Sequence, residues 1–195
     1  MVDNMLDFEL HRVNSLLYRR SGTVSGYLLT DFAAAFPSVH HAWLFFVIEA
    51  MGIPNAILSF FRTLYSNSFT TILFKGRCWA SFLFRRGLRQ GCPSSMLLFS
   101  LGLDPILRWL VAKILHPDDA LRGYADDLGF SLRQLAYSLP RLDRAFLIIS
   151  ATSGLTLKLR KCAIVPHYCR DMNKIKLMAS LFLSWPCCSL TRAAR

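Results

Sequence analysis

A chain of 195 residues with 53% hydrophobic and 18% charged residues can bury one substantial core, which excludes an intrinsically disordered tail. Its 23 Lys and Arg residues against 12 Asp and Glu residues give a net charge of +11 and a pI near 9.8. This charge suits a protein that neutralises phosphates, but ribosomal, membrane-surface and polymerase proteins share it, so it does not choose among them.

Two apolar stretches, residues 42–61 and 96–115, have the length of a membrane-spanning helix. Pro54 breaks the first, and Asp104 with Pro105 interrupts the second, so we predict no transmembrane segment and no membrane partner. The N-terminal residues are acidic where a signal peptide is basic and then apolar. The pattern does not favour secretion, and we expect an intracellular location, nuclear or cytoplasmic.

The six cysteines form no C-x-x-C pair, so free thiols are expected. A zinc site can be drawn from Cys162, His167, Cys169 and Cys187. Its spacing matches no common pattern of zinc ligands, and we do not predict it.

The first element expected is a helix over residues 4–20, followed by a loop over residues 21–25 that contains Gly22 and is followed directly by Gly26. A short apolar run over residues 27–30 is typical of a buried strand. This strand delivers Asp31 at its carboxyl end, which makes Asp31 the first candidate for chemistry.

Two helices are expected next, one from Pro37 to Met51 and another that begins at Pro54 and Asn55. Four apolar side chains of the second helix recur at helical spacing and should share one face: Ile57, Phe60, Phe61 and Leu64. We expect this pair of helices to pack on a sheet.

A hairpin follows, in which residues 69–75 and 78–84 are joined at Gly76 and Arg77, because both segments are rich in β-branched and aromatic residues. A charged loop over residues 85–91 comes after it. A long apolar helix should then run from Ser94 or Ser95 to Leu115, and Asp104-Pro105 should kink or restart it.

Residues 123–131 are predicted to form two short strands around a tight turn at Asp126 and Asp127. Residues 132–152 should form a further helix, which Gly154 ends as a left-handed cap. The turn therefore places an acidic doublet in an otherwise apolar segment.

Asp126 and Asp127 are flanked by apolar and aromatic residues, where two carboxylates are costly to desolvate unless a cation neutralises them or a turn projects them into water. Asp31 repeats this pattern at the end of its own strand. If the two strands are neighbours, the carboxylates converge, and hard oxygen ligands of this kind suit Mg²⁺. The alternative is that each acid is an ordinary turn or cap residue.

Four motifs in sequence order resemble those of the reverse transcriptases of non-LTR (LINE-type) retrotransposons. The segments DFAAAFPSV (residues 31–39), RGLRQGCPSS (86–95), YADD (124–127) and SGLTLKLRK (153–161) are similar to motifs A, B, C and D. One box could arise by chance, whereas four in the correct order could hardly do so. The chain departs from the family at Pro37, where an acidic residue is frequent, and at Lys158, where Asn is usual.

The resemblance implies an RNA-directed DNA polymerase that transfers nucleotides from dNTPs onto a primer 3′-hydroxyl with two Mg²⁺ ions, for which Mn²⁺ could substitute. It implies that Asp31, Asp126 and Asp127 are catalytic and hold the metals. Asp31 and Asp126 would bridge the ions, the Phe32 carbonyl would be a further ligand, and Asp127 would be more peripheral. Lys161 would approach the triphosphate and stabilise or protonate the leaving pyrophosphate.

The resemblance also implies a set of nucleotide-binding residues. Phe36 would lie under the incoming sugar and exclude a 2′-hydroxyl, although it could instead be a core residue. Gln90 and Gly91 would contact the nucleotide and template, since glycine admits a close backbone and an amide bonds to sugar or base edges. Arg89 would join this set, and Arg86 and Tyr124 would contact nucleic acid; for both arginines a solvated loop is the alternative.

The fold implied is an α+β polymerase palm, a small antiparallel sheet packed on helices, with fingers and thumb largely missing. The palm would span residues 1–165, with residual fingers at residues 1–25 and a strand-like segment at residues 155–165. Residues 166–195 read as an irregular tail, possibly outside the domain. RNA template, DNA primer and dNTPs are the expected partners, and the sequence says nothing of protein partners.

Three other functions stay open at this point. The chain could be a catalytically inactive retroelement relic that at best binds nucleic acid. A group II intron or retron type of reverse transcriptase would share the Y-x-D-D box, although the RQGCP sequence and the spacing between motifs favour the LINE type. An RNA-dependent RNA polymerase is disfavoured by Phe36, because such an enzyme must admit a 2′-hydroxyl.

Overall fold

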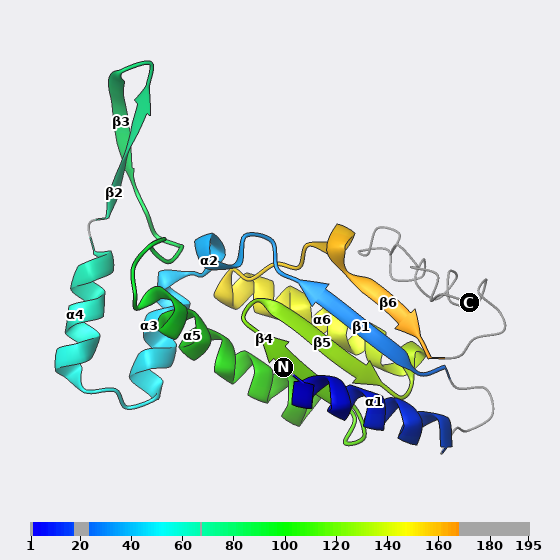
Figure 1. Ribbon diagram of the computed structural model, residues 1–195. Coiled ribbons are helices and arrows are strands. Elements are labelled where there is room, and N and C mark those ends of the chain that lie inside the picture. Colours follow the sequence, from blue (N-terminus) through cyan, green and yellow to red (C-terminus); the bar gives the residue numbers. More distant parts are fainter. Residues whose placement is uncertain (1, 18–23, 67, 168–195) are drawn as a thin grey trace. The chain divides into compact units, whose positions relative to one another are not determined.

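The computed structural model describes residues 2–17, 24–66 and 68–167 (Figure 1). The chain divides into two units, of which the first comprises Met1–Ala33, Ile106–Ser150 and Thr156–Arg195 and the second comprises Ala34–Pro105 and Ala151–Leu155. Each unit is described by itself. The expected tail lies almost wholly outside the described residues, as does most of the loop expected over residues 21–25.

The first unit contains a four-stranded antiparallel sheet in the order β4-β5-β1-β6. The strands are β1 (Gly26–Asp31), β4 (Ala120–Tyr124), β5 (Asp127–Leu132) and β6 (Ala163–Pro166). The α+β class and the antiparallel sheet are therefore confirmed. The strand-like stretch expected at residues 155–165 is mostly irregular, with a 3₁₀ turn, η2 (Leu159–Lys161), before β6.

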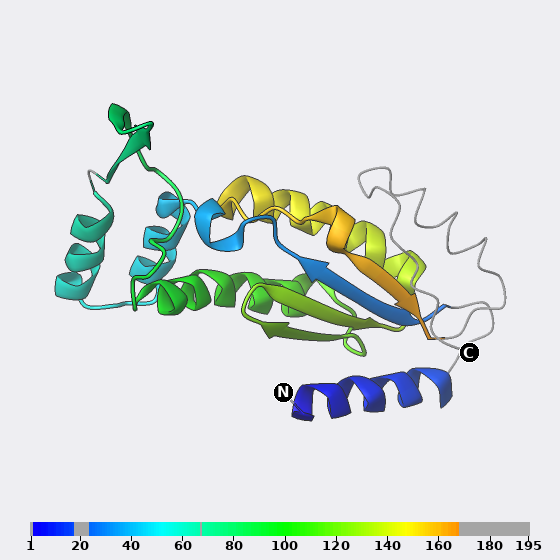
Figure 2. The same cartoon turned by 45° about the horizontal axis from the view of Figure 1, so that its top comes forward.

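Helix α6 (Leu135–Ser153) covers one face of this sheet, where alternate strand residues such as Leu28 and Phe130 are fully buried. The Phe146 ring of α6 packs edge-on against the Phe130 ring, with ring centroids 6.1 Å apart. Helix α1 (Val2–Leu17) lies on the opposite face (Figure 2), where the Tyr27 hydroxyl donates a hydrogen bond to the Phe8 carbonyl. The two helices give the sheet its core on one side and a partial cover on the other.

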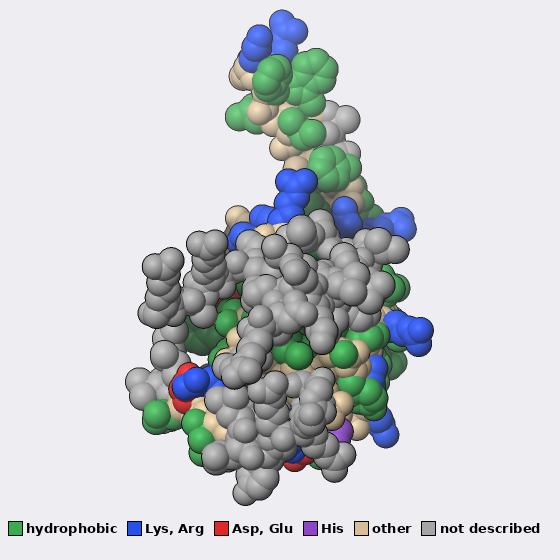
Figure 3. Space-filling view, turned by 90° about the vertical axis from the view of Figure 1, so that its right-hand side faces the viewer, with side chains coloured by type: hydrophobic (Ala, Val, Ile, Leu, Met, Phe, Trp, Pro, Cys, Tyr) green, Lys and Arg blue, Asp and Glu red, His purple; other side chains and the backbone are tan. Residues whose placement is uncertain are grey.

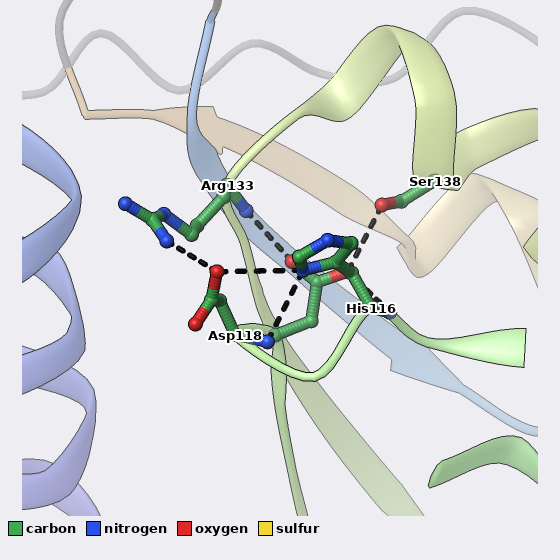
Figure 4. A network of polar contacts seen from close by, with 5 residues as sticks. His116, Asp118, Arg133 and Ser138 are labelled. Carbon is green, nitrogen blue, oxygen red and sulfur yellow. Dashed lines mark hydrogen bonds and ion pairs between the residues drawn. The ribbon is translucent and has the colours of Figure 1, made fainter. Parts of the chain in front are cut away.

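A polar network joins the loop before β4 to the start of α6 (Figure 4). The Asp119 carboxylate accepts hydrogen bonds from the backbone N–H of Arg133 at 2.9 Å, the hydroxyl of Ser138 at 3.0 Å and the backbone N–H of His116 at 3.2 Å. Asp118 forms a more exposed ion pair with the Arg133 guanidinium. Asp119 thus satisfies backbone donors that would otherwise lack a partner where the chain enters the helix.

The second unit begins with two helices where one was expected, so the predicted helix from Pro37 to Met51 is wrong. The structure has α2 (Ala35–Ser38) and α3 (His41–Ala50), separated by two extended residues. The break is stabilised by long-range bonding, because the His40 N–H donates to the Ser153 carbonyl at 2.8 Å. Gly154 beside it has φ +82°, which confirms the left-handed cap, and a Cβ there would lie 2.3 Å from the Ser38 carbonyl oxygen.

Helix α4 (Asn55–Tyr65) begins as expected but buries a different face. Leu58, Phe61 and Tyr65 are buried, whereas Ile57 is 46% and Phe60 61% exposed. Within the second unit α3 and α4 contact each other, and the expectation that they pack on a sheet stays a prediction. Apolar residues surround much of α4, so periodicity alone could not choose its buried side.

The hairpin of β2 (Phe69–Phe74) and β3 (Arg77–Leu83) turns at Lys75 and Gly76, one residue before the predicted turn. Both turn residues have positive φ, 49° and 72°, as a type I′ turn requires. Helix α5 (Ser95–Trp109) runs through Pro105 without ending and continues as a π-helical turn at Leu110–Ile114. Of the two outcomes expected at Asp104-Pro105, the restart is therefore wrong and the kink stays a prediction.

The helix Ser95–Ile114 is long and apolar enough to cross a membrane by length and composition. Several of its side chains are buried in the protein instead: Leu98, Phe99, Leu103, Ile106 and Leu110. The indole N–H of Trp43 also donates to the Gly102 carbonyl at 3.0 Å. A helix packed in a protein core meets the same criteria, so this single match is weak support for a span.

Candidate active site

Two of the three aspartates are direct partners across the β1–β5 ladder. Asp31 ends β1, Asp127 begins β5, and their Cα atoms are paired in the antiparallel register. Opposite residues of an antiparallel pair project to the same face of a sheet, so both carboxylates lie on the face that carries α1. Two like charges in this position repel each other, and the arrangement requires a compensating cation.

The third aspartate lies in the turn between β4 and β5. Tyr124 pairs with Asp127, which makes Ala125 and Asp126 the two turn residues. The predicted turn at Asp126 and Asp127 is thus shifted by one residue. Ala125 has φ +53°, a left-handed conformation that is unfavourable for a residue with a Cβ. Tyr124 is 72% exposed, so its ring is free of the core.

The Phe32 side chain is buried and contacts the ring of Phe146. Its backbone forms an isolated bridge with Leu157, made by the hydrogen bonds Lys158 N–H to Asp31 O and Ala33 N–H to Thr156 O, both 2.8 Å. Neither bond uses the Phe32 carbonyl. The bridge fixes the backbone directly after Asp31 while leaving that oxygen out of the ladder.

Lys161 supplies a cation beside the aspartates. Its Nζ lies 2.7 Å from Oδ2 of Asp31, whose side chain is only 15% exposed. The hydrogen bond and charge of Asp31, and then the charges of Asp127 and Asp126, raise the pKa of Lys161 above its ordinary value. In the structure Lys161 neutralises Asp31, and its expected approach to a triphosphate stays a prediction.

The donor set fits a divalent cation in part. Among the described residues, no three side chains of His, Cys, Asp or Glu gather closely enough to hold a metal ion. Asp31 and Asp127 nevertheless face the same side, with the Lys161 ammonium bonded to Asp31. The Lys161 ammonium shows that a positive charge is accommodated at this position. Carboxylate oxygens are the hard ligands that Mg²⁺ prefers, so the site suits this ion.

Within the second unit, backbone hydrogen bonds hold the loop after the hairpin against the segment after Ala34. The Gly87 N–H donates to the Val39 carbonyl at 2.7 Å and the Leu88 N–H to the Phe36 carbonyl at 2.8 Å. The Phe36 ring is partly exposed and stacks on Phe99 with centroids 4.6 Å apart. The structure therefore brings the motif A and motif B segments together, and Phe36 has a packing partner.

The remaining predicted residues of this loop differ in how firmly they are held. The Arg89 guanidinium bonds to the Ser68 hydroxyl at 2.8 Å and lies 6.0 Å from the Tyr65 ring centroid. Arg86, Gln90 and Gly91 are exposed, and Gly91 has φ +78°. The Arg89 guanidinium is thus held by contacts with Ser68 and Tyr65 of the protein itself.

Sequence reasoning missed two residues that position this loop. The buried ring of His41 contacts the Gly87 carbonyl through Nε2 at 2.8 Å, and the Ser95 hydroxyl donates to the Arg89 carbonyl at 2.5 Å. The sequence places Ser95 at the end of motif B and at the start of a helix, but indicates no contact with the loop. No spacing pattern marks either contact, because both join residues that only the fold brings together.

Comparison with known proteins agrees with this geometry. Residues 4–177 match the family model described as reverse transcriptase (RNA-dependent DNA polymerase). The chain is 31% identical over 134 residues to the transposon TX1 uncharacterized 149 kDa protein of Xenopus laevis, covering 65% of this chain and 10% of that protein. It is 30% identical over 141 residues to the Pol polyprotein of the R2DM element of Drosophila melanogaster, covering 69% and 13%.

Solved structures show the same fold at low identity. A Candida tropicalis telomerase in complex with a fragment of telomeric RNA matches with a TM-score of 0.65 at 13% identity, covering 87% of this chain and 30% of the telomerase chain. An apo form truncated from its C-terminal domain matches with a TM-score of 0.61 at 14% identity, covering 85% and 35%. The chain thus spans roughly a third or less of every protein compared here.

Proposed function

The chain belongs to the reverse transcriptase (RNA-dependent DNA polymerase) family, and from this premise we propose that it carries the nucleotidyl-transfer site of an RNA-directed DNA polymerase. The observation that carries the proposal is the register that sets Asp31 opposite Asp127 on one face of the sheet, next to the Asp126 turn. A paired carboxylate site beside a lysine is suited to hold divalent metals and a triphosphate.

In this proposal the carboxylates of Asp31 and Asp126 would hold two Mg²⁺ ions, with the Phe32 carbonyl as a further ligand and Asp127 in a more peripheral role. The ions, or Mn²⁺ in their place, would lower the pKa of the primer 3′-hydroxyl and neutralise the leaving pyrophosphate. Lys161, which pairs with Asp31 in the structure, would donate a hydrogen bond or a proton to the leaving pyrophosphate oxygen. Its pKa, raised beside the carboxylates, keeps it charged.

The nucleotide-binding residues of the proposal are Phe36, Arg89, Gln90, Gly91 and Lys161. Phe36 would exclude a 2′-hydroxyl by bulk, and its stacking on Phe99 supports this because a held ring is a firmer steric barrier. Gln90 and Gly91 are exposed and so available to sugar and base edges. Arg86 and Tyr124, also exposed, would contact nucleic acid.

The proposed substrates are an RNA template, a DNA primer and dNTPs. The complex of Candida tropicalis telomerase with a fragment of telomeric RNA supports nucleic acid as the partner class. The net charge of +11 agrees with this, since phosphate contacts dominate such affinity. We keep residues 1–165 as the proposed palm region, although the family match extends to residue 177.

Two measurements test the catalytic proposal. In primer extension on an RNA template with Mg²⁺, Asp126→Ala and Asp31→Asn should each lower extension by at least about a hundredfold. Mn²⁺ binding followed by electron paramagnetic resonance should weaken in the same variants, and this readout does not depend on how firmly the chain grips a duplex. Asp118→Asn is the matched control, because Asp118 is an exposed acid of the same unit. Equal extension and equal Mn²⁺ binding by wild type and Asp126→Ala would end the assignment.

A second candidate is an inactive retroelement relic that at best binds nucleic acid. One observation favours it: among the described residues, no cluster of three metal-binding side chains is preformed. This candidate predicts oligonucleotide binding that Asp31→Asn leaves unchanged and no extension with either Mg²⁺ or Mn²⁺. The two candidates therefore differ in the Mn²⁺ titration as well as in activity.

A further inference from the structure

The β2–β3 hairpin carries a row of rings on one face. In its register Ile72 pairs with Trp79, Thr70 with Phe82, and Phe74 with Arg77. Paired residues project to the same face, and a register shift between Thr70 and Ile72 keeps residues 79 and 82 on one side although they are three positions apart. We call the surface formed by Phe74, Arg77, Trp79 and Phe82 the aromatic face.

The rings of the aromatic face are open to solvent. Phe74 is 59%, Trp79 57% and Phe82 49% exposed, and the Phe84 ring extends the row at 5.4 Å from Phe82. A two-stranded ribbon that leaves large rings uncovered is marginally stable in water, so such rings indicate a binding surface. Rings displayed on strands are also the geometry on which proteins stack successive unpaired bases.

Positive charge surrounds these rings (Figure 3). Lys75 and Arg77 lie at the tip, where the Lys75 ammonium is 5.6 Å from the Phe74 ring centroid. The base continues into Arg85 and Arg86. Between Glu49 and Asp104 the sequence contains no acidic residue and six basic ones: Arg62, Lys75, Arg77, Arg85, Arg86 and Arg89. This charge is complementary to a polyanion and unsuited to a basic or neutral protein surface.

The opposite face of the hairpin is different in kind. Phe69 pairs with Leu83 and Leu73 with Cys78, and none of these side chains is charged. Leu73 is 70% exposed, as open as any ring on the aromatic face. This face carries one exposed ring, Phe69, near the base of the hairpin and is otherwise aliphatic toward the tip, so we call it the aliphatic face. The two faces of one ribbon therefore offer an internal comparison between a basic surface with several rings and a neutral, mostly aliphatic one.

We propose that the aromatic face binds single-stranded RNA, with bases stacked on Trp79 and Phe82 and phosphates bound by Lys75 and Arg77. The proposal rests on the proposed function only for the choice of RNA as the polyanion. Stacking of bases on aromatic side chains tolerates any base sequence, so this surface would bind the template RNA without sequence preference. Each stacked ring contributes on the order of tenfold or more to affinity, as judged by alanine substitution.

Fluorescence anisotropy of the whole chain with a labelled oligouridylate of about 20 nucleotides tests this surface. Trp79→Ala combined with Phe82→Ala should raise the Kd at least about tenfold, whereas Trp79→Phe, which keeps a ring, should stay within about threefold. Leu73→Ala is the matched control on the aliphatic face and should change the Kd less than about twofold. Circular dichroism of every variant confirms that the fold is retained.

A blunt RNA duplex and a salt series complete the test. Duplex binding should be unaffected by the double variant, because paired bases cannot stack on the rings. Arg77→Gln should reduce the slope of log K against log salt for the oligouridylate by about 0.7, the value for one phosphate contact on a single strand. Unchanged oligouridylate binding in the folded double variant, or an equal loss of duplex binding, would overturn the proposal, as would an aliphatic-face variant that weakens binding as much.

These outcomes are separable from the catalytic proposal. If the wild type shows neither primer extension nor Mn²⁺ binding, but the double variant binds oligouridylate more weakly, the RNA-binding surface is supported and the catalytic proposal is not. If Mn²⁺ binding depends on Asp31, but replacing Trp79 and Phe82 leaves the oligouridylate affinity unchanged, the catalytic site is supported and the RNA-binding surface is not.

Discussion

Lys161 holds Asp31 by a 2.7 Å ion pair at the point where β1 ends and Asp127 stands directly opposite. The lysine therefore offsets the repulsion between two facing carboxylates while no other cation is bound. It also competes with any divalent metal that needs the same Asp31 oxygen. The Lys161–Asp31 ion pair therefore couples the stability of this end of the sheet to metal binding at the proposed site.

Lys161→Met should strengthen divalent metal binding. Removing the ammonium frees the Asp31 carboxylate and lowers local positive charge, so the Kd for Mn²⁺ should fall on the order of fivefold. Electron paramagnetic resonance titration measures it without substrate. Lys161→Arg keeps the charge and should resemble wild type. An unchanged or weaker affinity in Lys161→Met would show that the lysine does not compete for this site.

Phe36→Ala should lower discrimination against ribonucleotides if the ring lies under the incoming sugar. The expected loss in the dNTP to rNTP ratio of kcat/KM is on the order of tenfold to a hundredfold. Phe99→Leu is the matched control, because it removes the stacking partner but leaves the Phe36 ring in place. Should both variants lose stability while the nucleotide ratio stays constant, Phe36 is only a packing residue.

Stability should decline in mild acid because of His167. Burial, and then the charge of Arg12, lower the pKa of His167 from 6.5 to about 4. The folded chain thus keeps the ring neutral while the unfolded chain takes up a proton below pH 6.5. The free energy of unfolding should fall as pH drops from 6.5 to about 4, by on the order of 1–2 kcal/mol, because solvent screens a half-buried ring and reduces the effect of the full shift.

Urea denaturation between pH 4 and 7 measures this dependence, with His167→Phe as the comparison. Phenylalanine retains a ring against Tyr27, whose ring centroid lies 4.3 Å from that of His167, but cannot be protonated. The pH slope over this window should flatten in the variant. A slope that persists in His167→Phe would assign the acid sensitivity to other groups.

Asp119→Ala should destabilise the first unit by about 2–4 kcal/mol, because it leaves two backbone N–H groups and the Ser138 hydroxyl without their acceptor. Asp118→Ala removes only an exposed ion pair with Arg133 and should cost less than about 1 kcal/mol. Thermal or chemical denaturation of the two variants compares adjacent acids directly. Similar losses in both would contradict the distinction drawn from their contacts.

Ala125→Gly should stabilise the chain by about 0.5–1 kcal/mol, since glycine adopts the φ of +53° at this turn without the Cβ clash. Ala42→Gly lies on exposed helix α3 and should destabilise by about 1 kcal/mol. Opposite signs for the same substitution would identify backbone strain as the cause. A loss of stability in Ala125→Gly would refute it.

The sequence alone marked the aspartates and the four motifs as candidates, and it placed β1, the start of α5 and the cap at Gly154 within about one residue. A short apolar run ending in Asp31, a Tyr-x-Asp-Asp turn and a glycine at 154 each carry their structural meaning within a few residues. Local propensity and turn chemistry act over that same range, which is why β1, β5 and the cap at Gly154 matched expectation.

Only the tertiary structure decided how these parts meet. The pairing of Asp31 with Asp127 joins positions nearly a hundred residues apart, and the Lys161 contact depends on a 3₁₀ turn after an isolated bridge. Likewise the break at His40 follows from its bond to Ser153 rather than from local residues. Register and partner choice arise from long-range packing, so the sequence named the candidate carboxylates, while the fold determined which of them face each other and which cation joins them.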